Sequence, residues 1–330
     1  MRAVVLDGNG GPEVLQSRQI PAPVPGPAEV LVEVVATAVN RADLLQRMGF
    51  YPGPPTDHEV PGLEFAGRVV GVGGTVGRWS VGDEVMGIVG GGAYAEQLTV
   101  HQDQAVRVPA GMSLDVAGAL PEVFVTAWDA LVLQGGLGRG GTALVHAGAS
   151  GVGTAAIQIC RAVGAEVVVT ASAAKCGACE AIGAVVAVDY ASDDWVVAVA
   201  EHTGGRGVDV VLDVVGGDYL DRNVDALAVG GTIVQVGVMG GGTATFGLGK
   251  LLPKRATIVG TVLRARSLDE KIGLSRAFEA SVVPLFEDGS LRVVIDRRYP
   301  LDEVAAAHVY MESNANVGKI ALDVCPDPVG

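Results

Sequence analysis

The stretch LVHAGASGVGTAAIQ, residues 144–158, decides the fold of this 330-residue chain. An apolar run stops at small residues and then resumes with helical spacing. From Gly151 it reads G-x-G-x-x-A, with Gly151, Gly153 and Ala156 in the three key places. In a dinucleotide-binding turn the first glycine allows the tight turn and the second lets the backbone approach a pyrophosphate. The small third residue lets helix and strand pack closely. The positive end of the helix then faces the phosphates.

The sequence around this turn alternates strand and helix signals, as a Rossmann domain requires. A helix-like stretch over 122–134 precedes the strand that leads into the turn. The later strands are near-continuous apolar runs, typical of a parallel sheet covered on both faces. We expect them in 166–172, 185–190, 208–216, 232–237 and 255–263. The intervening helices are expected in 151–163, 174–184, 192–204, 219–231 and 267–289.

The first third of the chain has a different texture, rich in Val, Pro and Gly, with short β-like runs between turn signals. One helix is expected in 40–49, with Asn40 as its N-cap. The β-like texture returns after residue 290. The prediction is an α/β protein: a β-rich domain of residues 1–121 and 290–330, an inserted six-stranded Rossmann domain of residues 122–289, and a cofactor cleft between them.

Composition narrows the possible partners and compartment. The formal net charge of −14 disfavours nucleic acid and anionic membranes as partners. No apolar run is long enough to span a bilayer, and the N-terminus lacks a signal-peptide core, so a cytoplasmic location is expected. Four cysteines are too few for a disulfide scaffold.

The end of the second Rossmann strand indicates which nicotinamide cofactor is bound. An NAD site places an acidic residue there to bind the ribose hydroxyls. This strand instead ends in neutral residues that include Ser172, and Lys175 follows. A hydroxyl and an ammonium suit a 2′-phosphate, so the sequence favours NADPH.

The segments NRADLLQRMGFYP, HAGASGVGTAAIQ, MGGG, LLPKRATIVGTVLRARS and MESNANVGKIAL together resemble the tumour-suppressor-inducible quinone oxidoreductase family. This family is part of the medium-chain dehydrogenase/reductase superfamily, so the resemblance implies that the β-rich domain is GroES-like. The zinc enzymes of the superfamily carry a cysteine and a histidine where this chain has Asn40 and Leu63. A leucine cannot bind zinc and an amide binds it poorly. The resemblance therefore implies a zinc-free branch with no metal site.

The resemblance also carries site residues onto this chain. It implies that NADPH is held by Gly151, Val152, Ser172, Lys175 and Tyr190, and that Met239, Leu263 and Arg264 border the nicotinamide. Asn40, Tyr51 and Thr126 match positions near the reacting end, and we take Asn40 and Tyr51 as the candidate catalytic residues. The remaining candidates for cofactor contact are Gly148, Ser150, Gly153, Val215, Gly216, Gly237 and Lys319.

Some chemically capable residues are assigned no function. Cys176 and Cys179 have C-x-x-C spacing but no second pair, which favours helix packing over redox or zinc chemistry. His146 lies in the first Rossmann strand and is expected to be buried. Asp43 has two possible roles, as a structural cap or as the group that orients its loop. Trp128 is expected in the core or in a cleft wall.

The predicted activity is NADPH-dependent reduction of a quinone or similar conjugated carbonyl, without a metal. Two alternatives stay open: an enoyl-thioester reductase with Tyr51 as its proton donor, and an NADPH-binding sensor or structural protein with little turnover. The partner is a small-molecule quinone, and the resemblance also implies a homodimer paired through the sixth Rossmann strands.

Overall fold

The structure is a computed structural model that describes residues 1–51 and 56–325. It consists of two compact units, one formed by Met1–Val123 with Arg264–Gly330 and the other by Phe124–Leu263. The Pro-rich segment directly after Tyr51 lies outside the described residues.

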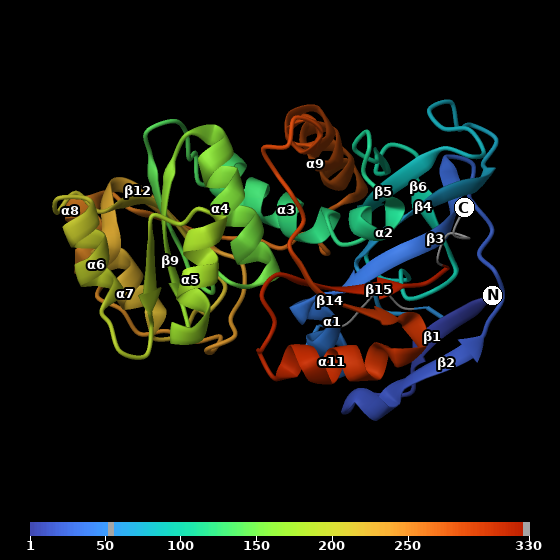
Figure 1. Ribbon diagram of the computed structural model, residues 1–330, viewed down its shortest axis with the longest axis horizontal. Coiled ribbons are helices and arrows are strands. Elements are labelled where there is room, and N and C mark those ends of the chain that lie inside the picture. The colour runs from blue at the N-terminus through green and yellow to red at the C-terminus, as the bar shows by residue number, and fades with distance from the viewer. Residues whose placement is uncertain (52–55, 326–330) are drawn as a thin grey trace. The chain divides into compact units, whose positions relative to one another are not determined.

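The first unit is built on a mixed sheet with the order β14-β15-β3-β4-β5-β7, and β6 pairs with the same long strand β3. Figure 1 labels all of these strands except β7. A separate antiparallel pair, β1 and β2, precedes this sheet. The strands are β1 (Arg2–Leu6), β2 (Leu15–Gln19), β3 (Glu29–Val39), β4 (Glu64–Val72), β5 (Glu84–Ile88), β6 (Gln97–His101), β7 (Val106–Arg107), β14 (Ile295–Pro300) and β15 (Lys319–Asp323).

The C-terminal tail returns to the first unit, as the sequence texture predicted. Strand β15 pairs antiparallel with β3, with Ile320 opposite Val39. This pairing brings Lys319 next to the end of β3, where α1 begins. The helices of the unit are α1 (Arg41–Arg47), α2 (Leu114–Ala117), α9 (Leu268–Ser281), α10 (Val283–Glu287) and α11 (Val304–Glu312), together with the start of α3 (Pro121–Trp128).

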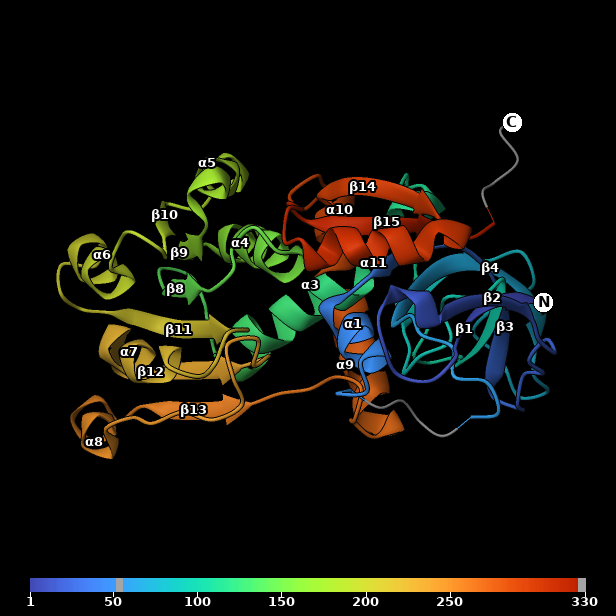
Figure 2. The same cartoon turned by 90° about the horizontal axis from the view of Figure 1, so that it is seen from below.

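The second unit contains a six-stranded parallel sheet with the order β10-β9-β8-β11-β12-β13, and Figure 2 shows these strands in that sequence from top to bottom. In chain order this is the doubly wound arrangement 3-2-1-4-5-6, so the predicted α/β class is confirmed. The strands are β8 (Thr142–Val145), β9 (Glu166–Ala171), β10 (Val186–Asp189), β11 (Val208–Asp213), β12 (Leu227–Gln235) and β13 (Thr257–Gly260).

The helices of the second unit follow the expected alternation. They are α4 (Gly151–Val163), α5 (Ala173–Ile182), α6 (Trp195–His202), α7 (Tyr219–Ala226) and α8 (Leu251–Lys254). Trp195 and Val199 of α6 join Val224 of α7 in one buried cluster with Leu144 of β8 and Val211 of β11. This packing orients α6 and α7 against the same face of the sheet.

Three expected helices differ from those in the structure. The stretch over 122–134 is helical, but its second half widens into π-helical turns over Asp129–Gln134. The helix expected over 219–231 ends at Ala226, because Leu227 already pairs with Val208 of β11. The helix expected over 267–289 is two helices, α9 and α10, and Pro284 stands at the start of the second, where its missing N–H costs least.

The compact units divide the chain between Leu263 and Arg264, and the expected domain bounds of 1–121 with 290–330 and 122–289 stay a prediction. Residues 264–289, which were expected in the Rossmann domain, belong to the first of these units. Side chains of α9 and α10 form ion pairs with the rest of that unit: Glu279 pairs with Arg78, in the loop between β4 and β5, and Glu287 pairs with Arg107 of β7. These ion pairs join segments distant in sequence, so no local pattern indicates the boundary.

Candidate functional site

The glycine-rich turn of the second unit connects β8 to α4 and has the geometry of an anion cradle. Ser150 caps the helix by accepting a hydrogen bond from the N–H of Gly153 at 3.0 Å. A Cβ on Gly153 would lie 2.4 Å from the carbonyl oxygen of Ala147, so only glycine fits there. A Cβ on Gly148 would meet the Val169 side chain at 2.6 Å, which shows how closely the turn packs on β9. The turn therefore presents the N-terminus of a 13-residue helix.

The other cofactor candidates of this unit follow the carboxyl ends of the neighbouring strands. Because parallel strands end at one edge of the sheet, the structure gathers these residues along that edge, where ligands of doubly wound folds bind. They are Ser172 and Lys175 after β9, Tyr190 after β10, Val215 and Gly216 after β11, Gly237 and Met239 after β12, and Leu263 after β13. Tyr190 and Met239 are about half exposed, at 50% and 52%.

A buried chain of hydrogen bonds fixes the loop after β11. One carboxylate oxygen of Asp213 accepts from the N–H of Val215 at 2.6 Å and of Gly216 at 2.9 Å. Its other oxygen accepts from the amide of Asn223 at 3.0 Å. The Asn223 carbonyl then lies 2.7 Å from Nε2 of His146. We name His146, Asn223 and Asp213 the imidazole network.

The imidazole network assigns the tautomer of His146. Because the Asn223 amide nitrogen donates to Asp213, its oxygen must accept the proton of His146 Nε2. Nδ1 then accepts from the Thr170 hydroxyl at 3.0 Å. Complete burial lowers the pKa of His146, which keeps the ring neutral. The expectation of a buried His146 is confirmed, and its partners are ones the sequence analysis missed.

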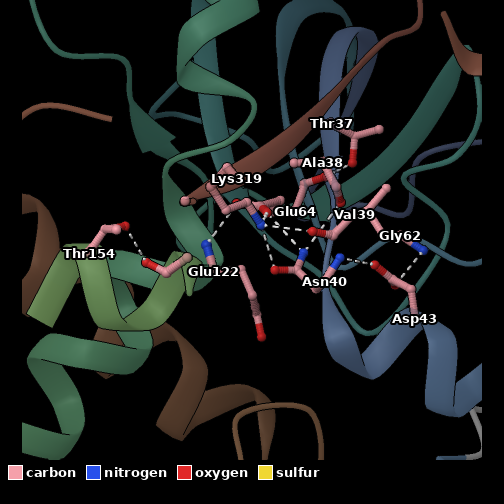
Figure 3. A network of polar contacts seen from close by, with 12 residues as sticks. Thr37, Ala38, Val39, Asn40, Asp43, Gly62, Glu64, Glu122, Thr154 and Lys319 are labelled. Carbon is pink, nitrogen blue, oxygen red and sulfur yellow. Dashed lines mark hydrogen bonds and ion pairs between the residues drawn. The ribbon is translucent and has the colours of Figure 1, made fainter. Parts of the chain in front are cut away.

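The first unit has a polar centre where β3 ends, and Figure 3 shows three side chains converging there. Nζ of Lys319 lies 2.7 Å from Oε1 of Glu64, 2.6 Å from Oδ1 of Asn40 and 3.2 Å from the carbonyl oxygen of Val39. The amide of Asn40 also donates to Oε1 of Glu64 at 2.9 Å. We name Lys319, Glu64 and Asn40 the charged network.

The contacts of Lys319 indicate a structural role, which the sequence analysis did not assign to it. The side chain is buried, and each of its three ammonium protons has an acceptor within the first unit. Lys319 therefore fixes Asn40 and balances Glu64, while its predicted contact with the cofactor stays a prediction. Glu64, which the sequence analysis missed, directly follows Leu63 in the segment PGLEFAG, and this position next to a replaced zinc ligand could have pointed to it.

The donor set around Asn40 suits a protonated side chain better than a metal. The Asn40 amide is occupied by Lys319 and Glu64, and the neighbouring Leu63 is apolar and buried. Within residues 1–51 and 56–325, no group of three or more His, Cys, Asp and Glu is placed to hold a metal ion. The metal-free reaction remains a prediction.

Asp43 fulfils both roles that the sequence left open. Its carboxylate accepts from the N–H of Asn40 at 2.8 Å, which fixes the start of α1. It also accepts from the N–H of Gly62 at 3.2 Å and from the hydroxyl of Tyr94 at 3.1 Å, which orients the loop that leads into β4 at Glu64. Burial raises the pKa of Asp43 to about 6 against the opposing effect of these hydrogen bonds.

Tyr51 and Arg264 lie together in the first unit. The Arg264 guanidinium lies 5.0 Å from the centre of the Tyr51 ring and donates to the Tyr51 carbonyl at 2.9 Å. It also donates to the Gly90 carbonyl at 2.7 Å and to Oε1 of Gln46 at 3.0 Å. Arg264 also lines a recess of about 460 Å³ with Gln46 and Gly90. The structure thus gives Arg264 a role in positioning Tyr51, and its border with the nicotinamide stays a prediction.

One hydroxyl group and one carboxyl group on α3 complete the set of candidate site residues. Thr126 is buried on α3. Glu122, in the first turn of the same helix, donates its N–H to Oε2 of Glu64 at 2.9 Å. Burial, with the nearby negative charge of Glu64, raises the pKa of Glu122 to about 8. The sequence analysis missed Glu122, because nothing near it in the chain marks a carboxyl group as buried.

The remaining candidates behave as packing residues. Trp128 is buried, and Cys179 is buried within α5. Burial raises the pKa of Cys179 to about 11 and also raises the pKa of Cys176, which makes both poor thiolates. Among the described helices, none combines the length and the apolar character needed to cross a bilayer.

Family models and known proteins agree with this architecture. Residues 26–110 match the alcohol dehydrogenase GroES-like domain, and residues 151–279 match the zinc-binding dehydrogenase model. The human synaptic vesicle membrane protein VAT-1 homolog is 32% identical, over 99% of this chain and 87% of its own length. A quinone oxidoreductase of Pseudomonas aeruginosa is 33% identical, over 95% of this chain and 96% of its own length.

Solved structures show the same fold. Escherichia coli quinone oxidoreductase complexed with NADPH aligns with a TM-score of 0.88 at 30% identity, covering 98% of this chain and 100% of that one. The JamJ enoyl reductase aligns with a TM-score of 0.87 at 26% identity, covering 98% of each chain.

Proposed function

Because this chain belongs to the medium-chain dehydrogenase/reductase superfamily, together with quinone oxidoreductases and VAT-1 homologues, we propose that it is an NADPH-dependent reductase of quinones or similar conjugated carbonyls that uses no metal. Two features of the chain together carry the proposal. The second unit has a glycine turn that fits a dinucleotide. In the first unit, Asn40 stands where the zinc enzymes have a cysteine ligand, and it is bound by Lys319 of the charged network.

The cradle fits a dinucleotide. Gly153 leaves the helix N-terminus open, and the Asp213 carboxylate holds the backbone of Val215 and Gly216 at the same edge of the sheet. The residues proposed to hold the cofactor are Gly148, Ser150, Gly151, Val152, Gly153, Ser172, Lys175, Tyr190, Val215, Gly216, Gly237, Met239 and Leu263, with Asn40, Thr126, Arg264 and Lys319 toward its reacting end. When bound, the nicotinamide supplies a hydride.

The cradle can be tested by replacing its central glycine. In Gly153→Ala the new Cβ would lie 2.4 Å and 2.5 Å from two backbone carbonyl oxygens, which cannot move far. We expect a loss of about 1–3 kcal/mol in the free energy of unfolding and at least tenfold weaker NADPH binding by fluorescence titration. Gly177→Ala on α5 is the matched control, because its Cβ would meet nothing within 4 Å. Equal NADPH affinity in both variants would contradict the proposed cradle.

The preference for NADPH is proposed from Ser172, at the start of α5, and Lys175 in its first turn. No carboxylate stands at the end of β9 to bind a free ribose. Lys175→Ala should therefore weaken NADPH binding about tenfold and leave NADH binding nearly unchanged. If both cofactors weaken alike, Lys175 does not contact the 2′-phosphate.

The absence of a metal is chemically reasonable for a quinone. Hydride transfer to a simple ketone produces an alkoxide, which needs zinc or a proton donor. Hydride transfer to a quinone produces a phenolate-like oxygen, whose pKa is near the value of about 10 for tyrosine. The new aromatic ring carries most of the charge, so the reaction needs no metal, and the protein positions two flat rings and excludes water. Tyr51, held by Arg264, provides an aromatic surface for that stacking.

The deciding experiment compares NADPH oxidation by para- and ortho-quinones with oxidation by crotonyl-CoA. We expect turnover with quinones and little with the thioester, because an enoyl thioester leaves an enolate that must also be protonated on carbon. Rapid thioester reduction that Tyr51→Phe abolishes would identify an enoyl reductase, the activity named for the JamJ neighbour. Tight NADPH binding without turnover of either substrate would favour a sensor.

A homodimer is also proposed. Strand β13 is the last strand of the six-stranded sheet, and within the described residues its outer edge has no partner strand. Ile258 on it is 38% exposed and Val262 just beyond it is 43% exposed. Edge-to-edge pairing with a second copy would cover these groups. A monomeric mass by light scattering at micromolar concentration would contradict the dimer.

A further inference from the structure

Across the residues that the structure describes, the carboxyl group of Glu122 stabilises no other part of the fold through a hydrogen bond of its own. Its backbone N–H donates to Glu64, but among the described residues its own Oε2 is buried without a hydrogen-bond partner. A buried carboxyl oxygen without a donor is costly unless the group carries a proton. The residue as a whole is only half-buried, although its Oε2 is not exposed to solvent.

The charged groups that face Glu122 come from several elements of the first unit. Glu64 on β4 and Asp43 on α1 repel a negative charge there, whereas Lys319 on β15 and Arg264 attract it. The ammonium of Lys319 is already engaged by Glu64 at 2.7 Å, and the donors of Arg264 are engaged by Tyr51, Gly90 and Gln46. The two cations therefore neutralise Glu122 only in part.

The result is a protonated acid at neutral pH. Burial and the repulsion by Glu64 raise the pKa of Glu122 to about 8, although the N-terminus of α3 favours its charged form. Tyr51 interacts electrostatically with Glu122, and burial together with this interaction raises the pKa of Tyr51 to about 12. Of the two neighbours, Glu122 is the stronger acid.

We propose that Glu122 is the proton donor that completes substrate reduction in this site. This inference rests on the proposed function and deepens it, because it assigns the second half of a reaction whose first half is hydride transfer. The reductant is the nicotinamide cofactor, and the oxidant is the quinone.

The step balances without a further reactant. A C–H bond of the reduced nicotinamide breaks, and its electron pair enters the quinone with the hydrogen, which leaves a hydroquinone monoanion. The O–H bond of Glu122 then breaks as an O–H bond forms on the anionic substrate oxygen. Because that oxygen has a pKa near 10, an acid with a pKa of about 8 transfers its proton downhill. The Glu122 carboxylate recovers a proton from solvent, which the repulsion by Glu64 favours.

The test uses Glu122→Gln, which keeps the shape of the side chain and removes its acidic proton. For the wild type we expect kcat with a quinone to fall as the pH rises through about 8, because Glu122 loses its proton there. In Glu122→Gln we expect kcat at pH 7 to fall about 100-fold and this pH limb to disappear, with NADPH affinity unchanged. Glu84→Gln, a surface glutamate paired with Arg68, is the matched control and should behave as wild type.

A second measurement does not depend on turnover. The infrared carbonyl band of a protonated carboxylic acid should be present in the cofactor-free protein at pH 7, disappear with a midpoint near pH 8, and be absent in Glu122→Gln. A folded Glu122→Gln variant with an unchanged rate and pH limb would overturn the inference while leaving the proposed function intact. An absent band in the wild type would overturn it as well. A wild type that reduces no quinone would overturn the proposed function, and this inference with it.

Discussion

Each of the two units buries a polar network that contains a carboxylate, and the two networks stabilise the buried negative charge in different ways. In the first unit a full ammonium charge on Lys319 balances a full carboxylate charge on Glu64 at 2.7 Å. In the second unit the Asp213 carboxylate forms no ion pair within the described part of the chain and is held by two backbone N–H groups and the Asn223 amide. Charge is therefore balanced by charge in the charged network and by oriented dipoles in the imidazole network.

Because their charges are balanced differently, the two networks respond differently to the loss of one member. Removing one member of an ion pair leaves an uncompensated buried charge, whereas removing one dipole leaves a weaker hydrogen bond. The charged network is consequently suited to hold Asn40 rigidly at the end of β3. The imidazole network is suited to shape the backbone of a loop at the carboxyl edge of the sheet.

The largest predicted effect comes from breaking the ion pair. Lys319→Met leaves the buried Glu64 carboxylate without its cation, and we expect the free energy of unfolding to fall by about 3–5 kcal/mol in urea titrations. The double variant Lys319→Met/Glu64→Leu removes both charges and should recover a large part of that loss. If the double variant is no more stable than the single one, charge compensation is not the role of Lys319.

A smaller effect is expected from the imidazole network. Asn223→Leu deprives His146 of its acceptor and Asp213 of one donor, so we expect a loss of about 2–4 kcal/mol in the free energy of unfolding, because two buried groups lose a partner. NADPH binding should weaken too, because the loop at Val215 and Gly216 loses part of its support. Thr170→Val, which removes only the donor to Nδ1, should cost about 1 kcal/mol. Equal losses in the two variants would contradict the network as described.

Much of the fold could be predicted from the sequence, because its signals are local. The apolar runs that became β8 to β13 and the glycine turn at Gly151 each lie within one short segment. The same locality explains the errors. The end of α7 at Ala226 depends on the pairing of Leu227 with Val208 of β11, which no local pattern in the chain shows.

The residues of the candidate site likewise fall into a group that local sequence predicts and a group that it does not. The position of the cofactor candidates at the carboxyl edge of the sheet could be predicted because each residue follows its own strand, and their contact with a cofactor stays a prediction. The charged network was missed because Glu64 and Lys319 are 255 residues apart in the chain, and only the pairing of β15 with β3 brings them together. Glu122 was missed for a related reason, since the buried charges around it come from distant elements.

The last predicted effect is a pH dependence of stability, which arises from a histidine of the first unit. Burial lowers the pKa of His308, in the first unit, to about 3, below its ordinary value of 6.5. The neutral ring is therefore favoured by the folded state. Its contribution to stability is complete above pH 6.5 and is lost as the pH falls from 6.5 toward 3, by up to about 1.4 kcal/mol per pH unit.

His308→Asn should therefore reduce the loss of stability between pH 7 and pH 5, measured by urea unfolding. Asp43 and Glu122 act in the opposite direction, because burial raises the pKa of each. The comparison of the variant with wild type isolates the histidine. An identical pH slope in both proteins would show that His308 is not held neutral.

The central claim is that the ammonium of Lys319, rather than a metal ion, supplies the positive charge beside Asn40 in an NADPH-dependent quinone reductase. The most direct measurement is the rate of NADPH-dependent quinone reduction by protein dialysed against a strong chelator, with the metal content measured on the same sample. We predict an unchanged rate in protein that contains no stoichiometric zinc. Loss of the rate on chelation, with recovery on adding zinc, would contradict the claim.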